Sequence, residues 1–191
     1  MEPINFFKMS GSGNDFIIVD NREDIVKNND LPGFIARICR RKMSVGADGV
    51  ILIEPSKNAD FKWQFFNSDG SNAEMCGNGA RCAARFAYVN GIAGQNLSFE
   101  TDAGIVSGQV KGDRVKLKMP DPVDLNLDYN IELKTGPVTV CSVNTGVPHV
   151  VVMNESIEDI DVFNLGSDIR FHEAFKPAGT NVNFISQLEQ G

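Results

Sequence analysis

The residues best suited to chemistry lie in one stretch, NSDGSNAEMCGNGARC, which runs from Asn67 to Cys82. Within it Cys76 directly precedes Gly77, Asn78 and Gly79, at the point where an apolar helix is expected to begin. Unpaired backbone N–H groups at a helix start bind anions, and glycine allows a ligand to approach the backbone closely. The sequence therefore predicts that a carboxylate binds these amides. The same amides and the helix dipole favour a thiolate at Cys76.

A thiolate in contact with a bound carboxylate is suited to abstraction of an α-proton or to nucleophilic attack. The alternative is a structural cysteine beside a glycine turn, and the spacing alone favours neither interpretation. His149 follows Pro148 and is either a helper in proton transfer or a histidine satisfied in a turn; a single histidine favours the turn. On residue type alone, Asn14, Asn67 and Asn181 are interpreted as turn formers.

Composition and charge restrict the class of protein. The chain has 191 residues, 42% of them hydrophobic, with 18 Lys and Arg against 25 Asp and Glu, for a net charge of −7. An acidic chain without a run of Lys or Arg argues against nucleic acid and anionic membranes as main partners. The sequence has no apolar stretch near the roughly 20 residues that span a bilayer, and residues 1–10 show no secretory signal. We therefore expect a cytoplasmic enzyme or binding protein.

The cysteines predict neither a metal site nor a disulfide framework. They stand at positions 39, 76, 82 and 141 without a Cys-x-x-Cys pair, and the chain has two histidines. A zinc site needs more ligands at closer spacing, and disulfide frameworks belong to shorter secreted chains. Cys39, Cys82 and Cys141 lie among apolar residues, so we expect them to be buried.

The elements that must position these residues are short strands and three helices. A turn is expected at Gly11–Asp15, and the break at Pro120–Pro122 predicts a domain boundary. The helix of residues 72–90 has little polar surface beyond Arg81 and Arg85, which predicts burial on most sides and a start that faces an interior cleft. Strands are expected at residues 4–7, 16–19, 50–53, 61–66, 97–100, 105–110, 114–119, 131–134, 138–143, 150–153 and 182–186, and helices at 31–41, 72–90 and 161–167.

Two segments resemble one another, Gly13–Val19 and Gly146–Val152. Each has a glycine, two turn residues, an aromatic ring and three branched apolar residues. Duplication and chance explain this similarity about equally well on the residues alone. If the segments are a repeat, the counterpart of Cys76 would lie roughly 63 positions after Gly146, beyond Gly191.

Seven segments, in order along nearly the whole chain, resemble the diaminopimelate epimerase family. They are Gly11–Phe16, Gly46–Gly49, Phe66–Gly70, Met75–Cys82, Thr101–Gly104, Gly146–His149 and Thr180–Phe184, and the block MCGNGARC is highly specific to that family. The resemblance implies an α/β (α+β) fold of two pseudo-symmetric domains, each a curved mixed β-sheet wrapped around a central helix, with the active site between them. Residues 1–120 would form the first domain, and residues 121–191 an incomplete second one.

The resemblance also implies an activity, the interconversion of LL- and meso-diaminopimelate in lysine and peptidoglycan precursor biosynthesis. In the family, two cysteines face opposite sides of one α-carbon, without pyridoxal phosphate, another cofactor or a metal, and the proteins commonly form homodimers. The resemblance assigns proton transfer to Cys76 and His149, the reacting carboxylate to the amides of Gly77 and Asn78, and the substrate's amino-acid groups to Asn14, Asn67 and Asn181.

The chain departs from the family pattern in three places. The second cysteine's block, Ala-Cys-Gly-Thr-Gly after a Glu-Arg pair, does not occur before Gly191, so we expect an N-terminal fragment that does not epimerise by itself. Val147 and Gly49 stand where members carry asparagine and glutamine, which bears on specificity. Two alternatives stay open: a proline-racemase-like isomerase on the same scaffold, and a non-catalytic module that binds amino acids or a partner protein.

Overall fold

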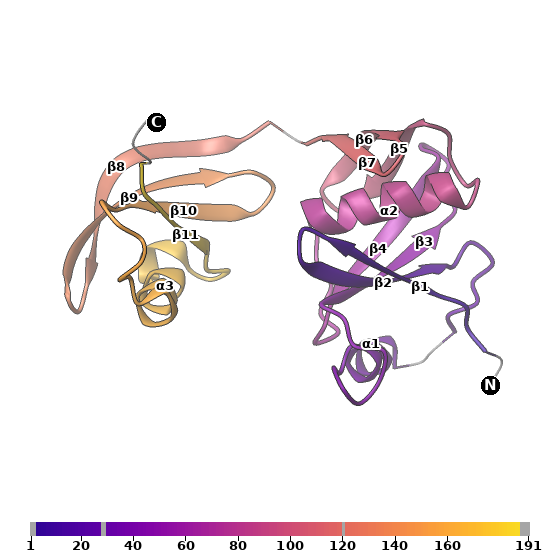
Figure 1. Cartoon of the computed structure of the whole chain (residues 1–191), viewed down its shortest axis with the longest axis horizontal. Coiled ribbons are helices and arrows are strands. Elements are labelled where there is room, and N and C mark those ends of the chain that lie inside the picture. Colours follow the sequence, from indigo (N-terminus) through magenta and orange to yellow (C-terminus); the bar gives the residue numbers. More distant parts are fainter. Residues whose placement is uncertain (1–2, 28–29, 120, 188–191) are drawn as a thin grey trace. The chain divides into compact units, whose positions relative to one another are not determined.

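The computed structural model describes residues 3–27, 30–119 and 121–187. The chain divides into two compact units, Met1–Met119 (unit 1) and Pro120–Gly191 (unit 2) (Figure 1). Pro120 at the predicted break, and the predicted domain ends at residues 1 and 191, lie outside the described residues. Among the described residues, no helix combines the length and apolar character that crossing a membrane requires.

Unit 1 is a seven-stranded mixed sheet whose strands follow one another in chain order. The β2–β3 and β4–β5 pairs are parallel, and the other neighbours are antiparallel. Helix α2 (Gly77–Val89) contacts strands at both edges of the sheet, β1 and β7, which confirms the predicted curved sheet around a central helix (Figure 1). The strands are β1 (Phe7–Gly11), β2 (Asn14–Asp20), β3 (Gly49–Glu54), β4 (Phe61–Asn67), β5 (Asn96–Thr101), β6 (Gly104–Lys111) and β7 (Arg114–Lys118).

The core of unit 1 explains why α2 lies inside the curve. Its buried face consists mostly of small residues, which let the sheet approach closely, and the sheet contributes large side chains such as Phe61, Trp63 and Phe99. Seven of its residues are buried, as the sequence predicted: Gly79, Ala80, Cys82, Ala83, Ala84, Phe86 and Ala87.

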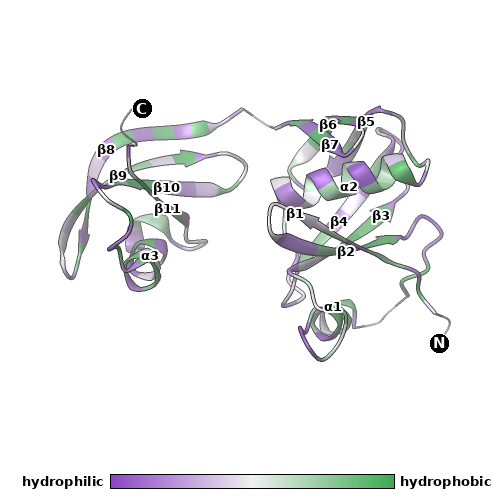
Figure 2. Ribbon diagram, in the orientation of Figure 1, coloured by the Kyte–Doolittle hydropathy of each residue, from purple (hydrophilic) through white to green (hydrophobic). Residues whose placement is uncertain are grey.

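A second core covers the opposite face of β2 and β3. Helix α1 (Leu31–Ile38) inserts Ile35 there, against Ile17 and Val50. Because both faces of these strands are buried, they are apolar almost continuously rather than alternating, as Figure 2 shows for β3. The helix ends at residue 38 rather than the predicted 41, where the chain turns back and Gly46 N–H donates to the Ile38 carbonyl.

Unit 2 is a four-stranded sheet in the order β11-β10-β9-β8. Helix α3 (Val162–Arg170) packs Ile169 against buried valines of β9 and β10, and a short 3₁₀ helix, η1 (Glu173–Phe175), follows it. The strands are β8 (Val123–Leu133), β9 (Gly136–Asn144), β10 (Pro148–Met153) and β11 (Asn181–Ile185).

The same local topology occurs in both units at the two segments that resemble one another in sequence, and a second time in unit 1, where the hairpin β3–β4 is followed by α2 and the parallel partner β5. In unit 1 an antiparallel hairpin, β1–β2, is followed by α1 and a parallel partner, β3; in unit 2 the hairpin β9–β10 is followed by α3 and a parallel partner, β11. Each helix is capped by an aspartate, Asp30 or Asp161, which accepts a backbone N–H three residues later. The second occurrence in unit 1 differs, because α2 is capped by Cys76. Sequence similarity, topology and aspartate caps together therefore favour a true repeat of the first segment.

Two predictions near the site were wrong in position. The first strand is Phe7–Gly11, not residues 4–7, and the turn is Ser12 and Gly13 alone, both with positive φ, as in a type I′ hairpin turn. Helix α2 begins at Gly77 rather than residue 72, because Cys76 has an extended backbone.

Two predictions in unit 2 were also wrong. Strand β8 begins at Val123, eight residues before the predicted start, and its register shifts where Asp124 and Asp128 adopt positive φ. Its polar, irregular first half hides the strand from a periodicity argument. Cys141 is half-buried rather than buried, and its Sγ lies 3.6 Å from Oδ1 of Asp128.

Candidate functional site

Cys76 is the N-cap of helix α2, and its side chain points back over the first turn. With φ −150° and ψ 113° it lies outside the helix, and Sγ accepts a hydrogen bond from Gly79 N–H at 3.4 Å. The first turn of a helix has no internal acceptors for its N–H groups, so Gly77 and Asn78 present their amides beside the same sulfur. The half-buried sulfur therefore lies where amide dipoles stabilise negative charge.

The two glycines of this turn have different reasons to be glycine. A Cβ at Gly79 would lie 3.3 Å from Ile51 Cδ1 and from Phe16 Cε1, so helix–sheet packing leaves little room for a side chain there. A Cβ at Gly77 would meet nothing nearer than 3.9 Å. Packing within unit 1 therefore does not require glycine at position 77, whereas close approach of a ligand to its amide would.

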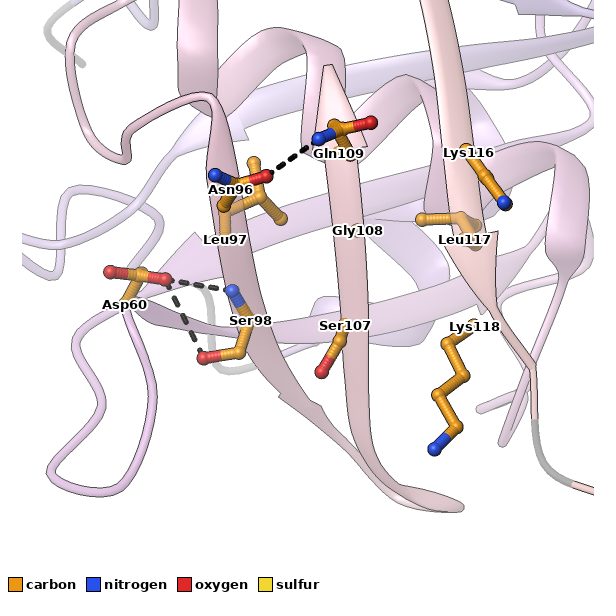
Figure 3. A pocket seen from close by; sticks show the side chains of 10 residues that line it. All are labelled: Asp60, Asn96, Leu97, Ser98, Ser107, Gly108, Gln109, Lys116, Leu117 and Lys118. Atoms are coloured by element: carbon orange, nitrogen blue, oxygen red, sulfur yellow. Dashed lines mark hydrogen bonds between the residues drawn. The ribbon is translucent and has the colours of Figure 1, made fainter.

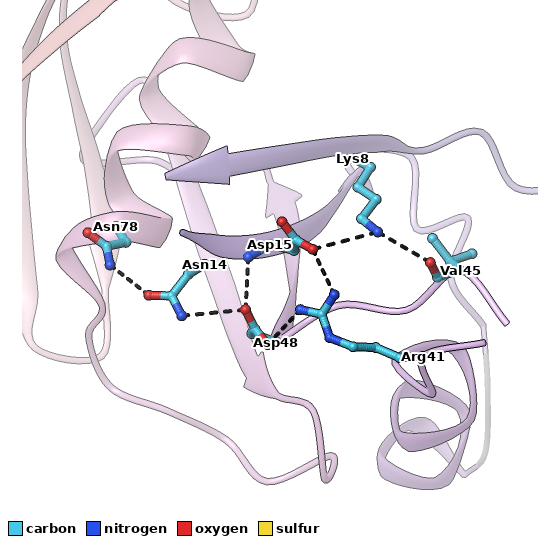
Figure 4. Close-up of polar contacts among 7 residues, drawn as sticks. All are labelled: Lys8, Asn14, Asp15, Arg41, Val45, Asp48 and Asn78. Atoms are coloured by element: carbon cyan, nitrogen blue, oxygen red, sulfur yellow. Dashed lines mark hydrogen bonds and ion pairs between the residues drawn. The ribbon is translucent and has the colours of Figure 1, made fainter. Parts of the chain in front are cut away.

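A chain of hydrogen bonds joins the start of α2 to the start of β2 (Figure 4). Arg81 Nη2 donates to Asn78 Oδ1 at 2.5 Å, Asn78 Nδ2 donates to Asn14 Oδ1 at 2.6 Å, and Asn14 Nδ2 lies 3.4 Å from Asp48 Oδ2. A guanidinium only donates and a carboxylate only accepts. The two charged ends therefore fix the orientation of both carboxamides, and one N–H of each has no partner among the residues that the structure describes.

Asp48 anchors that chain from the turn before β3. Its carboxylate accepts Asp15 N–H at 2.9 Å and a bond from Arg41 at 3.0 Å, while Arg41 also reaches the Asp15 carboxylate at 2.9 Å (Figure 4). The backbone N–H of Asp15 is the main reason why the pKa of Asp48 lies below its usual value, and Arg41 and Asn14 lower it further. Asp48 is therefore ionised at neutral pH and holds Asn14 in place.

Close approach of β1 completes this arrangement. A Cβ at Gly11 would lie 2.8 Å from the Asn78 carbonyl oxygen and 3.0 Å from Cys82 Sγ. Burial raises the pKa of Cys82 to about 11, so this neighbouring cysteine is a thiol near neutral pH. The sequence motif at residues 46–49 contained Asp48, but residue types alone gave no role to Asp48, Arg41 or Arg81.

Asn67 lies at the same end of the sheet but outside this chain of hydrogen bonds. Its Cα pairs with Gly49 on β3, which in turn pairs with Phe16 on β2. Its side chain is exposed, and Nδ2 donates to Ser71 Oγ at 3.0 Å within the turn that follows β4. In the structure Asn67 therefore acts as a turn former.

The remaining predicted residues, His149 and Asn181, form a separate group in unit 2. They are Cα partners on β10 and β11. Arg170 Nη1 lies 3.4 Å from Asn181 Oδ1, and Asn183 Nδ2 lies 3.2 Å from His149 Nδ1. His149 also lines a cavity of about 400 Å³, together with polar side chains that include Asp124, Asn126, Tyr129 and Lys176.

A further cavity, in unit 1, does not coincide with either group. It measures about 750 Å³ on the outer face of β5, β6 and β7 and is lined by polar side chains such as Asn96, Gln109 and Lys116 (Figure 3). None of its lining residues is a predicted site residue. In the part of the chain that the structure describes, no cluster of three or more His, Cys, Asp or Glu is arranged to hold a metal ion.

Comparisons with known proteins match most of this chain to one family. The family model described as diaminopimelate epimerase matches residues 6–125. A diaminopimelate epimerase of Aquifex aeolicus (strain VF5) is 45% identical over 197 residues, covering 98% of this chain and 70% of the relative. One of Hydrogenobaculum sp. (strain Y04AAS1) is 46% identical, covering 96% of this chain and 70% of the relative.

Solved structures with low sequence identity show a similar fold. A probable proline racemase from Agrobacterium radiobacter K84 superposes with a TM-score of 0.61 at 16% identity, covering 78% of this chain and 52% of that one. A phenazine biosynthesis protein of the PhzF family from Bacillus anthracis gives 0.60 at 19% identity, covering 80% and 56%. The chain thus spans about half of each of these proteins, and at such identities the likeness concerns the fold alone.

Proposed function

Because this chain belongs to the diaminopimelate epimerase family, we propose that it binds diaminopimelate and that Cys76 removes the α-proton from one face of the reacting carbon. The observation that carries this proposal is the position of Cys76 Sγ. It is the N-cap of the buried helix α2, bonded to Gly79 N–H and adjacent to the amides of Gly77 and Asn78. A base and an anion-binding site for the substrate's carboxylate are thus adjacent.

The chemistry requires both parts. In the proposed step the C–H bond breaks, the proton forms an S–H bond at Cys76, and the electron pair is delocalised into the substrate carboxylate. An α-proton of an amino acid is very weakly acidic, so donors must stabilise the charge that develops on that carboxylate. The amides of Gly77 and Asn78 supply such donors already in place, and their interaction with the developing negative charge is stronger where water is excluded.

The carboxamides of Asn14 and Asn78 are proposed to position the substrate. Each uses one N–H in the bonded chain and has its oxygen occupied, so what each offers a ligand is an N–H donor. Donors suit a carboxylate better than an ammonium group. In unit 2, His149 and Asn181 are proposed as further residues that contact substrate, and Asn67 is kept as a more distant positioning residue.

Inversion needs a second acid that returns a proton to the opposite face. The proposal gives this role to a second cysteine, outside the 191 residues. Of the other cysteines in the chain, Cys39 and Cys82 are buried in the cores of unit 1, and Cys141 lies against Asp128 in unit 2. We therefore expect residues 1–191 to exchange the α-proton without epimerising the substrate.

The test is α-proton exchange of LL-diaminopimelate in D₂O, followed by NMR with the 191-residue chain. We expect slow loss of the α-proton signal with retained configuration, and a loss of exchange of at least ~100-fold in Cys76→Ala. Conversion to the meso isomer would contradict the single-base proposal. Binding in calorimetry without exchange would instead support a non-catalytic amino-acid-binding module, and exchange of L-proline would support the proline-racemase-like alternative.

Gly77→Ala tests the role of the backbone amides separately from the sulfur. The added methyl has room in unit 1, and alanine favours a helix over glycine, so we expect unchanged or slightly higher stability but weaker binding of diaminopimelate. Gly79→Ala is the matched comparison, because the same methyl would lie 3.3 Å from Ile51 and Phe16, so an effect of packing on stability is expected at position 79 and not at position 77. Unchanged affinity in Gly77→Ala would remove the proposed role of that amide.

A further inference from the structure

Asn183 makes two hydrogen bonds in unit 2 that together determine the state of a neighbouring ring. Its Nδ2 donates to the Val150 carbonyl oxygen at 3.1 Å and lies 3.2 Å from His149 Nδ1. A carbonyl oxygen can only accept, so the carboxamide must turn its NH₂ group, and not its oxygen, toward Val150. The same NH₂ group therefore faces His149, and Nδ1 of that ring must be the acceptor.

From this geometry we infer that Asn183 is a positioning residue that holds His149 as the tautomer with its proton on Nε2. A neutral imidazole carries one proton, so an accepting Nδ1 places that proton on Nε2. The inference rests on the proposed function only in counting His149 among the residues that contact substrate. In this state the ring has no free lone pair, so His149 donates a hydrogen bond, which suits a substrate carboxylate, and leaves proton abstraction to Cys76.

The internal repeat supports a specific role for this pair of residues. Aligning Phe16 with His149 places Ile51 opposite Asn183, because Ile18 pairs with Ile51 and Val151 pairs with Asn183. In unit 1 the aligned pair, Phe16 and Ile51, is buried and packs on Gly79 of α2. In unit 2 the same positions hold two polar, half-buried side chains joined by a hydrogen bond. Packing does not account for an asparagine there, whereas orientation of His149 does.

The other histidine provides an internal reference. His172 Nδ1 accepts Ala174 N–H at 3.2 Å, and its Nε2 lies 3.2 Å from the Glu132 carbonyl oxygen. Both partners are backbone groups, so His172 is also held with its proton on Nε2, independently of Asn183. With two histidines in the whole chain, a spectrum of ring nitrogens contains one test ring and one reference ring.

The experiment is ¹⁵N NMR of the ring nitrogens of the 191-residue chain, at a pH above the titration of both rings. A protonated and an unprotonated ring nitrogen differ widely in chemical shift, so the tautomer of each histidine can be assigned directly. We expect protonated Nε2 in both rings. In Asn183→Asp the carboxylate accepts instead of donating, so His149 should change to the Nδ1-protonated tautomer while His172 does not. In Asn183→Ala we expect a mixture of tautomers at His149.

The result that overturns the inference is Nδ1 protonation of His149 in the unmodified chain, or an unchanged tautomer in both variants. The His172 signals report whether unit 2 remains folded in each variant. Addition of diaminopimelate separates this inference from the proposed function. If substrate shifts the His149 signals and its affinity falls up to ~10-fold in Asn183→Asp, both are supported. Substrate that leaves the His149 signals unmoved contradicts the role of His149, whereas the tautomer result stands independently.

Discussion

The two units share one strand–helix–strand order but bury it to different extents. In unit 1 the shared strands lie between two cores, one toward α1 and one toward α2. The described residues of unit 2 have one core, on the side of α3, and many of the unit's large apolar side chains are exposed. They include Val123, Leu125, Leu127, Met153, Val162, Phe163 and Phe171.

This difference shows how one backbone arrangement supports two kinds of surface. In unit 1, where α2 covers the strands, two aligned strand positions hold Phe16 and Ile51. In unit 2 the equivalent positions hold His149 and Asn183. The polar side chains of His149 and Asn183 hydrogen-bond to one another and are only half-buried, so their burial costs little free energy. In unit 2, therefore, His149 and its partner Asn183 occupy positions that unit 1 uses for its core.

Charge separates the units as clearly as burial does. Residues 1–119 have 15 Lys and Arg against 14 Asp and Glu, whereas residues 120–191 have 3 against 11. The units can also be observed separately, because the single tryptophan, Trp63, is in unit 1, and both histidines, His149 and His172, are in unit 2.

The largest expected effect comes from a matched pair of core substitutions. Ile51 and Ile169 are both fully buried, one in the α2 core of unit 1 and the other in the core beside α3 in unit 2. Ile→Ala removes the same atoms at each site and should cost ~2–5 kcal/mol. We expect Ile51→Ala to lower the urea midpoint of Trp63 fluorescence. Ile169→Ala should instead lower the midpoint of the histidine NMR signals, because each unit has its own core.

Equal movement of both midpoints in both variants would contradict separate cores and indicate that the units unfold as one. If the units unfold separately, unit 2 should also unfold at lower urea in the unmodified chain, because it buries fewer large apolar side chains. Tyr88 and Tyr129, one in each unit, give a second pair of probes for the same comparison.

A smaller effect on stability is expected from the ion pair between Asp48 and Arg41 in unit 1. The pKa of Asp48 is lowered, first by Asp15 N–H and then by Arg41 and Asn14, so its carboxylate stabilises unit 1 above the ordinary aspartate pKa. That contribution is lost as the pH falls through the lowered pKa. Asp48→Asn should therefore be less stable at pH 7, by ~1 kcal/mol or less for so exposed a pair, and the gap should close in acid.

Asp161→Asn is the matched control in unit 2. Asp161 caps α3, and the backbone N–H of Asn164 lowers the pKa of its carboxyl group. Removal of this carboxylate should therefore change the urea midpoint of the histidine signals and leave that of Trp63 fluorescence unmoved. A gap between Asp48→Asn and the unmodified chain that stays constant down to pH 2 would contradict the role given to the Asp48 carboxylate.

Much of the fold could be predicted from the sequence because its signals are local. The alternating rings at Phe61, Trp63 and Phe65 predicted β4, and the small residues after Gly79 predicted a buried helix. Strand β8 was largely missed because its first half is polar and bulged. The position of Cys76 at a helix start was also a local signal, since it depends on four consecutive residues.

The contacts that position the site residues could not be predicted in this way. Asn78 bonds Asn14 across 64 positions, Asp48 bonds Asp15 across 33, and Asn183 meets His149 across 34. Such pairs depend on strand register and on how α2 lies in the sheet, and a one-residue slip in register would turn each strand side chain to the other face. Residue types were enough to predict the candidate site residues, but their hydrogen-bond partners could be identified only from the strand register.

The smallest expected effect concerns the unequal charge of the two units. Unit 2 has 11 acidic residues against 3 Lys and Arg, so its carboxylates repel one another at neutral pH, whereas the near balance of unit 1 gives little net repulsion. Salt screens such repulsion over roughly 10 Å at 0.1 M. Raising NaCl from about 0.02 to 0.3 M should therefore stabilise unit 2 by a few tenths of a kcal/mol, measured from the urea midpoint of the histidine signals. The Trp63 midpoint should move less, or fall, because salt weakens the ion pairs that Arg41 makes with Asp15 and Asp48 in unit 1.

Asp159→Asn offers a control for this prediction. The substitution removes an exposed charge without a change of shape, so it should reduce the salt response of unit 2 alone. Equal stabilisation of both units by salt would mean that ion exclusion, and not the charge difference between the units, accounts for the response.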